Sequence, residues 1–559
     1  MFRSLIQLLT PNLKKQLIIT SLLSSITALF EALDMLLMYY FLTLITNTSH
    51  NLQWFWNTTP IKNRIIITGF SLLLFKGIKF LTDKKSTKNF VHFGENCKIH
   101  LTNFFFNKFM DADLLSFKKH DTKEYTNYCV TSSINTSYIF LLYIQLLKSL
   151  TAFTCIGIII AFQSKIMLIA YVLFVAIFVA IKSIASKKKI LESGIKSDVT
   201  QRRINVILGE TFSLFKEIKL YGKEDLFKSK INKELHVLSN ARLRFDKSVS
   251  TLSLYNEFVI YSSAITIAML FTFFTNDISQ HFSLIGLFFL VLSKSQKPIN
   301  EMVSFSMHHS NHEGYLQSVN IFLQSLTQPV KNRESSIQIP FFHQLEIASL
   351  NFSYPNHPVF INASFECKKN ELIGIVGDSG KGKSTLLEIL CGLIPASANI
   401  KINGSENIGF ADLSLLCGYL PQKVTLLYDT IYNNIVLDDS PVTEQTIAKV
   451  WQVLEAVEMK FFVERIDNGL EYIVGENGSN LSGGQIQRIG LARVLYRNPQ
   501  ILLLDEFSAA LDKETESKIF ETLLHLKEKY TIILSTHSTE LKNKMDKIYC
   551  VEDHQLKLL

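Results

Sequence analysis

The chain has 559 residues, which is too long for one compact domain and predicts two to four. Hydrophobic residues make up 47% and charged residues only 19%, a composition that suits a chain partly embedded in a membrane and partly soluble. The net charge of +8 does not indicate nucleic acid, because the lysines lie mostly between apolar segments. Seven scattered cysteines, an odd number without metal-ligand spacing, argue against a disulfide framework.

Six apolar segments in the first 300 residues predict membrane-spanning helices. They are residues 17–45, 65–81, 138–162, 166–184, 252–274 and 282–292. Most supply the roughly 20 residues that a helix needs to cross the bilayer, while the second and the sixth are shorter and are predicted from their context. A buried helix of a soluble protein is the alternative for any single segment. Six such segments in series, with polar loops between them, favour a membrane domain.

The connections between the second and third segments and between the fourth and fifth are long and rich in lysine and arginine. By the positive-inside rule, these loops and both termini are predicted to lie in the cytoplasm. Each loop contains a break that predicts a short transverse helix, at residues 114–123 and near 212–222. We therefore predict a transmembrane domain over residues 1–327, a polar linker over 328–340 and a soluble α/β domain over 341–559.

A glycine-rich segment follows the apolar strand predicted at residues 372–376 and precedes a predicted helix, the context that a P-loop requires. It consists of Gly377, Asp378, Ser379, Gly380, Lys381, Gly382, Lys383, Ser384 and Thr385. Glycines let backbone amides approach a phosphate closely, Lys383 is predicted to reach the β- and γ-phosphates, and Ser384 is predicted to bind magnesium. Lys381 either adds charge to this site or is simply solvated.

Two acids end the next strongly apolar strand, predicted at residues 501–504. Asp505 is predicted to lie beside the magnesium, and Glu506 is predicted to polarise the attacking water, because phosphoryl transfer depends on positioning and charge neutralisation. An apolar run that ends in two acids is weak evidence alone. Its place after the P-loop makes it strong.

A glycine turn between these two motifs opens a basic, amphipathic helix. Its residues are Asn480, Leu481, Ser482, Gly483, Gly484 and Gln485. This segment resembles the signature motif of ABC ATPases. A helix N-terminus with free amides is a second anion-binding surface, and the resemblance implies that it contacts the ATP held by the P-loop of a second subunit.

The remaining positions of the ABC pattern follow in order, and their roles are those that the resemblance implies. Tyr354 is expected to stack on adenine, with an exposed strand tyrosine as the alternative. Gln422 is expected to contact magnesium and water, and His537 the γ-phosphate. Asp512 belongs to a segment that resembles the D-loop. Two departures are Phe507 and Ser508, where a small pair is usual, and the missing arginine after His537. Neither departure removes a catalytic group.

The resemblance covers nearly the whole chain. It implies a six-helix α-helical transmembrane domain followed by an α/β P-loop ABC ATPase domain with a helical subdomain. It also implies ATP and Mg2+ as cofactors and a dimer in a bacterial inner membrane, with the ATPase domain in the cytoplasm. Because one chain carries every element of the nucleotide site, a homodimer is the simplest assembly, and a heterodimer is the alternative.

Three short segments, residues 28–31, 215–223 and 478–482, resemble the lipid-linked oligosaccharide flippases within the exporters. They favour an ATPase that moves an amphipathic, lipid-linked substrate. An exporter of peptides or hydrophobic drugs is the alternative, and a membrane-bound regulator that does not transport is a second one.

Ionisable side chains in the apolar segments are candidates for a substrate cavity, because charges at membrane depth are expensive. The acids are Glu31, Asp34 and Glu257, and the bases are Lys76, Lys79, Lys148, Lys294 and Lys297. Lysines that line one cavity would suit an anionic pyrophosphate. Two alternatives stay open: the acids pair with the lysines and neutralise the cavity, or some of the lysines reach the cytoplasmic interface.

Overall fold

The computed structural model describes most of the chain, and its residues fall into two compact units. The described residues are 2–45, 60–119, 122–163, 172, 192–197, 199–274, 278–325, 341–355, 357–406, 408–438, 441–507, 513–536 and 544–559. The first unit comprises Met1–Ala112 and Ser116–Gln328, and the second comprises Asp113–Leu115 and Pro329–Leu559. The predicted linker 328–340 lies outside the described residues.

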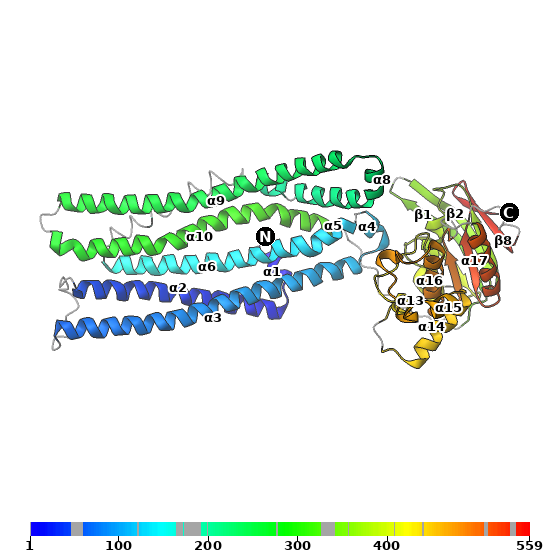
Figure 1. Cartoon of the computed structure of the whole chain (residues 1–559), viewed down its shortest axis with the longest axis horizontal. Helices are drawn as coiled ribbons and strands as arrows, with labels where there is room; N and C mark the ends of the chain where they lie inside the picture. Colours follow the sequence, from blue (N-terminus) through cyan, green and yellow to red (C-terminus); the bar gives the residue numbers. More distant parts are fainter. Residues whose placement is uncertain are drawn as a thin grey trace. The chain divides into compact units, whose positions relative to one another are not determined.

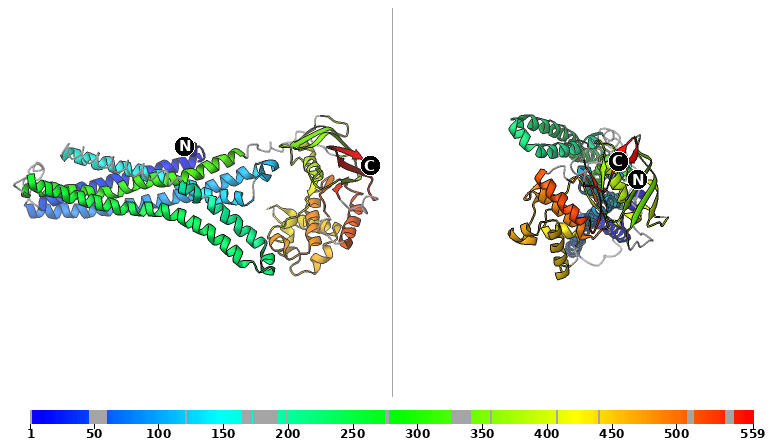
Figure 2. Two further views of the ribbon diagram at one scale, coloured as in Figure 1. Left: turned by 90° about the horizontal axis from the view of Figure 1, so that it is seen from above. Right: turned by 90° about the vertical axis from the view of Figure 1, so that its right-hand side faces the viewer.

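The first unit is mostly helical in its described part, and Figures 1 and 2 show its long helices running side by side. The long helices are α2 (Pro11–Ile45), α3 (Ile61–Met110), α6 (Ser133–Gln163), α9 (Glu224–Phe274) and α10 (Ile278–Ser325). The shorter ones are α1 (Phe2–Gln7), α5 (Thr122–Asn127), the π-helical turn Tyr128–Ser132 and α8 (Phe215–Leu220). Helix α4 (Leu114–Lys118) begins with residues assigned to the second unit and ends with residues of the first. Residues 192–197 and 199–213 are helical as well. Helices α4 and α8 lie within the two breaks predicted for the loops.

Among the described residues of this unit, three helices are long and apolar enough to cross a membrane: Pro11–Ile45, Lys62–Met110 and Glu124–Phe162. They contain the first three predicted segments, which are thereby confirmed as long apolar helices. The predicted segments 252–274 and 282–292 are helical within α9 and α10. The predicted segment 166–184 lies outside the described residues except for residue 172.

Two kinds of surface follow from the apolar composition of these helices. Side chains such as Phe93, Leu101, Phe105 and Phe140 are almost completely buried where α3, α6 and their neighbours pack together. Other large apolar side chains are exposed along the same helices, for example Phe70 at 66%. Exposed apolar side chains along a helix of this length are typical of a lipid-facing surface.

The described strands of the second unit form two sheets. Its strands are β1 (Gln344–Tyr354), β2 (His357–Lys368), β3 (Leu372–Val376), β4 (Ser397–Ile402), β5 (Cys417–Leu420), β6 (Ile501–Leu504), β7 (Thr531–Ser535), β8 (Lys547–Glu552) and β9 (Gln555–Leu558). The smaller sheet is antiparallel, in the order β2-β1-β4, and the larger has the order β5-β6-β7-β3-β8-β9. In the larger sheet, β5, β6, β7, β3 and β8 run parallel and β9 is antiparallel.

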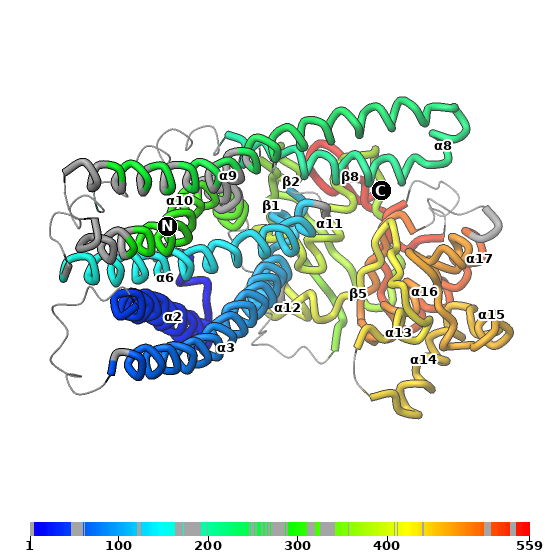
Figure 3. Tube along the Cα trace, turned by 60° about the vertical axis from the view of Figure 1, so that its left-hand side comes forward, coloured from blue at the N-terminus to red at the C-terminus, as the bar shows by residue number. Residues whose placement is uncertain are grey.

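The second unit also contains helices. They are α11 (Lys383–Leu390), α12 (Phe410–Leu413), α13 (Ile431–Val436), α14 (Glu444–Ala456), α15 (Lys460–Arg465), α16 (Gly483–Tyr496) and α17 (Lys513–Leu526), with 3-10 turns at Gly469–Glu471 and Glu476–Gly478. The strands β3, β6 and β7 are buried along their whole length, which explains their continuous apolar sequences. Figure 3 shows α13, α14, α15 and α16 gathered together as a helical subdomain, and α16 contacts β5.

Candidate functional site

The glycine-rich segment forms the loop between β3 and α11, and its backbone requires glycine at several positions. Gly377 and Gly382 have φ angles of 147° and 112°, in the region that favours glycine. A Cβ atom on Gly382 would lie 2.5 Å from Cγ1 of Val359. Gly380 also has a positive φ, of 79°, but a Cβ there would meet nothing within 4 Å. The loop therefore keeps open space beside its backbone, which fits a bound phosphate.

Lys383 begins α11, and its side chain is only 4% exposed. Its ammonium group donates to the backbone oxygens of Gly377 at 2.9 Å and Asp378 at 3.2 Å, and it lies 3.6 Å from Oε1 of Glu506. These bonds hold the ammonium inside the loop. Asp378, Ser379, Gly380 and Lys381 are exposed at the rim.

Asp505 follows β6 and is buried, at 3% exposure. Its Oδ1 accepts a hydrogen bond from the Ser384 hydroxyl at 3.0 Å, and its Oδ2 accepts one from the Tyr419 hydroxyl at 3.4 Å. Burial and the neighbouring Asp505 raise the pKa of Tyr419, so its hydroxyl stays protonated and donates. The carboxylate of Asp505, the hydroxyl of Ser384 and the amide of Gln422 together supply the hard oxygen ligands that Mg2+ prefers.

Glu506 lies next along the chain, with an unusual backbone φ of 40° for a residue other than glycine. Its Oε2 accepts a hydrogen bond of 2.7 Å from Nε2 of Gln422, which follows β5. The structure thus brings Lys383, Ser384, Gln422, Asp505 and Glu506 together at the carboxyl ends of parallel strands. This edge is where open α/β sheets bind their ligands.

Tyr354 ends β1 and reaches the same loop from the smaller sheet. Its hydroxyl lies 3.3 Å from Oγ1 of Thr385, and its ring packs against Phe352 with the ring centres 5.0 Å apart. An aromatic ring therefore lies beside the start of α11.

The predicted signature residues form the N-terminus of α16. The Ser482 hydroxyl accepts the backbone N–H of Gln485 at 3.3 Å, and the Gln485 side chain accepts the N–H of Ser482 at 2.8 Å, which makes a capping box. Ser482 and Gly483 are exposed, and the Asn480 side chain bonds the carbonyl of Ile473. Gly483 and Gly484 are the first two residues of α16.

Helix α16 also contacts the loop that carries Gln422. Nε2 of Gln487, a buried residue, donates to the backbone oxygen of Gln422 at 3.3 Å. Two further predicted residues, Asp512 and His537, lie outside the described residues.

Sequence reasoning missed two residues at this site, Tyr419 and Ser535. Both contact Asp505, Tyr419 through Oδ2 and Ser535 through Oδ1. The only signal in the sequence is that each is a polar residue in or directly after an apolar strand. That signal has no meaning until the strands are placed side by side.

In the first unit, Asp34 of α2 is the centre of a cluster of charges. Its side chain is 3% exposed, and its carboxylate oxygens lie 3.2 Å from Nζ of Lys76, 3.8 Å from Lys79 and 3.4 Å from Lys294. One acid therefore faces three ammonium groups, contributed by α3 and α10. Internal pairing, one of the alternatives for these charges, is thus present but does not neutralise the cluster.

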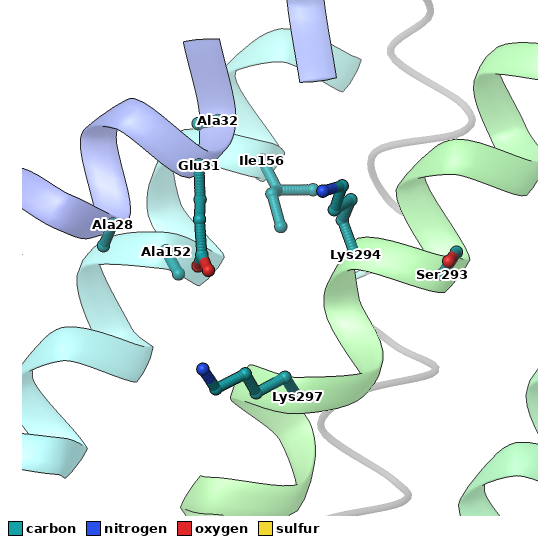
Figure 4. A pocket seen from close by; sticks show the side chains of 8 residues that line it. All are labelled: Ala28, Glu31, Ala32, Ala152, Ile156, Ser293, Lys294 and Lys297. Atoms are coloured by element: carbon teal, nitrogen blue, oxygen red, sulfur yellow. The ribbon is translucent and has the colours of Figure 1, made fainter. Parts of the chain in front are cut away.

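A cavity of about 190 Å³ lies between α2, α6 and α10, next to this cluster. Its charged lining residues are Glu31, Lys294 and Lys297, and the rest are small or apolar apart from Ser293. Figure 4 shows the carboxylate of Glu31 and the ammonium of Lys297 pointing into the same space. Among the described side chains, Lys297 has no acid within 4.0 Å. Lys148 is half-buried on α6, and Glu257 is exposed on α9.

Comparisons with known proteins agree with this arrangement. Residues 360–509 match the family model described as ABC transporter. The chain is 29% identical over 371 residues to a "Probable ABC transporter ATP-binding/permease protein" of Haemophilus influenzae. The match covers 64% of this chain and 65% of that protein, so the chain spans just under two thirds of that relative's length. It is 25% identical over 413 residues to an "ATP-dependent lipid A-core flippase" of Syntrophus aciditrophicus, covering 72% and 67%.

The solved structure of a bacterial Atm1-family ABC exporter with ATP bound has the same fold, with a TM-score of 0.81 over 98% of this chain and 96% of that one, at 18% identity. The second unit is therefore an ABC ATPase domain, and the helical unit that precedes it has the fold of an ABC exporter. Residues 360–509 therefore carry the ABC transporter ATPase pattern, and the chain as a whole has the fold of an ABC exporter, with one helical domain fused to one ATPase domain. This confirms the predicted fold class.

Proposed function

We propose that this chain hydrolyses ATP and uses the energy to move an amphipathic, lipid-linked substrate across a membrane. The observation that carries the proposal is the convergence of Lys383, Ser384, Gln422, Asp505 and Glu506 at one edge of the sheet. Each supplies a group that phosphoryl transfer requires, and they come from segments far apart in the sequence.

The proposed roles follow from the chemistry of each group. Lys383 and the loop amides bind the phosphates, and Tyr354 stacks on the adenine. Ser384, Gln422 and Asp505 would hold Mg2+, which when bound neutralises charge on the phosphates. Glu506 orients the attacking water, with its carboxylate held by Gln422 at 2.7 Å. His537 contacts the γ-phosphate, as the resemblance implies.

The proposed assembly is a homodimer in a bacterial inner membrane, with the ATPase domain in the cytoplasm. Asn480, Ser482, Gly483, Gly484 and Gln485 of one subunit would contact the ATP on the partner's P-loop, and Asp512 would lie at the same interface. Support comes from the exposure of Ser482 and Gly483 at the N-terminus of α16, the end of a helix that favours an anion. ATP binding would close the two ATPase domains on each other, and hydrolysis would reopen them.

Two observations support a lipid-linked substrate. Relatives of 25–29% identity are named lipid A-core flippases. In addition, the lysines at the Asp34 cluster and the adjoining cavity outnumber the acids, with Lys76, Lys79, Lys294 and Lys297 against Asp34 and Glu31. An excess of positive charge beside an apolar lining suits the phosphate of an amphiphile. We propose a lipid-linked oligosaccharide or a related glycolipid as the substrate.

The test uses the purified full-length chain in lipid vesicles. We expect ATP hydrolysis that requires Mg2+, is stimulated by a lipid-linked oligosaccharide pyrophosphate, and moves that lipid from one leaflet to the other. Hydrolysis that responds only to a peptide would replace the flippase with a peptide exporter. ATP binding without any turnover would contradict the proposal and favour a regulator that does not transport.

A further inference from the structure

Ser535 is a buried hydroxyl at the end of an otherwise apolar strand. Its exposure is 0%, and so is that of Ile532, Ile533 and Leu534, which precede it in β7. An apolar side chain would be the simplest choice at such a position, because a buried hydroxyl destabilises a fold unless it is hydrogen-bonded. The hydroxyl therefore needs an explanation in its partners.

The position of β7 in the sheet explains which partners are available. Strand β7 lies between β3, which leads into the P-loop, and β6, which leads into Asp505. Leu504 of β6 pairs with Leu534 of β7, so the next residues, Asp505 and Ser535, lie side by side. On the other side, Ile375 of β3 pairs with Ser535. This residue thus occupies the centre of the edge that carries the candidate nucleotide site.

Both hydrogen bonds of the Ser535 hydroxyl go to the two acids of this site. Its Oγ donates to Oδ1 of Asp505 at 2.7 Å and accepts the backbone N–H of Glu506 at 2.7 Å. A carboxylate can only accept and a backbone N–H can only donate, so the two bonds fix the orientation of the hydroxyl. One atom therefore connects the side chain of Asp505 to the backbone of Glu506.

The backbone of Glu506 gives the second bond its importance. Glu506 has a φ of 40°, in a region that residues other than glycine adopt only when their surroundings hold them there. The Ser535 hydroxyl bonds the N–H of this residue directly. Rotation about this φ would change the direction of the Glu506 side chain, which Gln422 contacts at 2.7 Å.

We propose that Ser535 is a positioning residue for ATP hydrolysis. Its hydroxyl fixes the position of the Asp505 carboxylate relative to the backbone of Glu506. It does not touch ATP; it acts through its two neighbours. This inference rests on the proposed ATPase function, and it assigns a role to a residue for which the sequence predicted none.

The experiment compares Ser535→Ala with Ser535→Thr and Ser535→Cys in the full-length chain. The matched control is Thr531→Val, because Thr531 lies at the other end of β7, is 1% exposed, and its hydroxyl accepts the N–H of Asn370 at 3.0 Å. Both substitutions remove one buried hydroxyl from the same strand. Four quantities are measured: kcat, the Mg2+ concentration that gives half-maximal activity, the Kd for a fluorescent ATP analogue with Mg2+ or with EDTA, and the Tm.

We expect Ser535→Ala to lower kcat about tenfold or more and to raise the half-maximal Mg2+ concentration severalfold, because a hydrogen bond to a charged group is lost. Its Kd with EDTA should stay within about twofold of the parent chain, whereas its Kd with Mg2+ should rise. In Ser535→Thr, kcat and the half-maximal Mg2+ concentration should lie within about threefold of the parent chain. In Ser535→Cys, whose thiol is a weaker donor of similar volume, both values should lie between those of Ser535→Ala and the parent chain. Thr531→Val should leave kcat and the Mg2+ dependence unchanged even where its Tm falls.

Two results would overturn the positioning role while the proposed function stands: parental kcat and Mg2+ dependence in Ser535→Ala, or equal losses in Thr531→Val. If the parent chain binds ATP but does not hydrolyse it, the proposed function fails. The Kd of Ser535→Ala with Mg2+ then still decides whether the hydroxyl positions Asp505. Should Ser535→Ala not fold, the Mg2+ dependence of Ser535→Cys decides instead, and a parental value overturns the role.

Discussion

The side chain of Glu506 contacts two neighbouring residues of the candidate nucleotide site. Its Oε1 lies 3.6 Å from the Lys383 ammonium, and its Oε2 accepts the Gln422 amide at 2.7 Å. Both neighbours are elements of the candidate nucleotide site, so this carboxylate lies where the attacking water of a phosphoryl transfer must be oriented. The role can be tested by changing one oxygen to an NH2 group.

We predict that Glu506→Gln keeps ATP binding within a fewfold of the parent chain and lowers steady-state hydrolysis about a hundredfold or more, the usual contribution of such a group. Glutamine has the same shape but lacks the charge. Glu521→Gln, an exposed carboxylate on α17, is the matched control and should hydrolyse ATP normally. Phosphate release and equilibrium ATP binding measure the two quantities, and near-parental turnover in Glu506→Gln would rule out the role.

Local motifs made much of this site predictable from the sequence. The P-loop places Lys383 and Ser384 by spacing alone, and the apolar strand before Asp505 places the two acids. Which side chains contact them depends on the order of strands that are distant in the chain. Tyr419 and Ser535 could not be predicted for this reason.

One departure from the family pattern is explained by packing: Phe507 is 2% exposed and lies in a hydrophobic core of the ATPase domain.

At the scale of the elements, Asn434 joins α13 to the preceding loop and to α16. Its side chain is completely buried, and its Oδ1 accepts the N–H of Leu427 at 2.8 Å while its Nδ2 donates to the carbonyls of Leu427 and Thr430, each at 3.0 Å. Arg493 of α16 adds a bond of 2.7 Å to the backbone oxygen of Asn434. The signature helix is thereby tied to the segment that follows Gln422.

We predict that Asn434→Ala destabilises the ATPase domain by about 2–4 kcal/mol, because it leaves several buried polar groups without partners. The neighbouring Asn433 is exposed, and its side chain donates to Asp429. Asn433→Ala is therefore the control and should cost less than about 1 kcal/mol. Unfolding of the full chain, followed by circular dichroism with and without ATP, compares the two, and equal stabilities would contradict this account of Asn434.

The elements of the helical domain show a different limit of sequence reasoning. The apolar segments 17–45 and 138–162 were predictable from their length, because a run of more than about 20 mostly apolar residues is typical of a membrane-spanning helix, and the shorter segment 65–81 was predictable from its place in the series. Which charges face each other was not predictable, since it depends on how α2, α3 and α10 rotate against one another. The structure places Lys76, Lys79 and Lys294 around Asp34, while Lys297 lies at the cavity beside Glu31.

At the scale of the whole molecule, the proposed face-to-face dimer makes each ATP site depend on two chains. Ser482 of one chain and Lys383 of the other would serve the same nucleotide. A mixed dimer of Ser482→Arg and Lys383→Ala chains should therefore contain one site with both substitutions and one site with neither.

We predict that each variant alone loses nearly all ATPase activity and that mixing the two chains restores one competent site per mixed dimer. Activity should rise with the fraction of mixed dimers, measured after differently tagged chains are purified in tandem. A mixture of parent and Lys383→Ala chains is the reference for a dimer with one P-loop lysine. Full cooperative activity in either variant alone would show that the composite site is wrong for this protein.

The charge excess in the helical domain leads to the last prediction. Lysines at the centre of a membrane helix each carry an insertion cost of about 2.5–3.5 kcal/mol, which an anionic partner reduces. Asp34 is one carboxylate among three ammonium groups, and Lys297 has no acid within 4.0 Å among the described side chains. If an anionic lipid supplies the missing negative charge, the lysine at the cavity should matter for stimulation by that lipid.

We predict that Lys297→Ala lowers the ratio of lipid-stimulated to basal ATPase activity about tenfold, the effect of one lost charge-assisted hydrogen bond. Lys228→Ala, an exposed lysine on α9 whose partner is Asp225, is the matched control and should keep the ratio of the parent chain. The titrants are a lipid-linked oligosaccharide pyrophosphate and a neutral lipid with the same tail. A ratio that stays unchanged in Lys297→Ala, or a neutral lipid that stimulates equally, would remove the anionic amphiphile from the proposal.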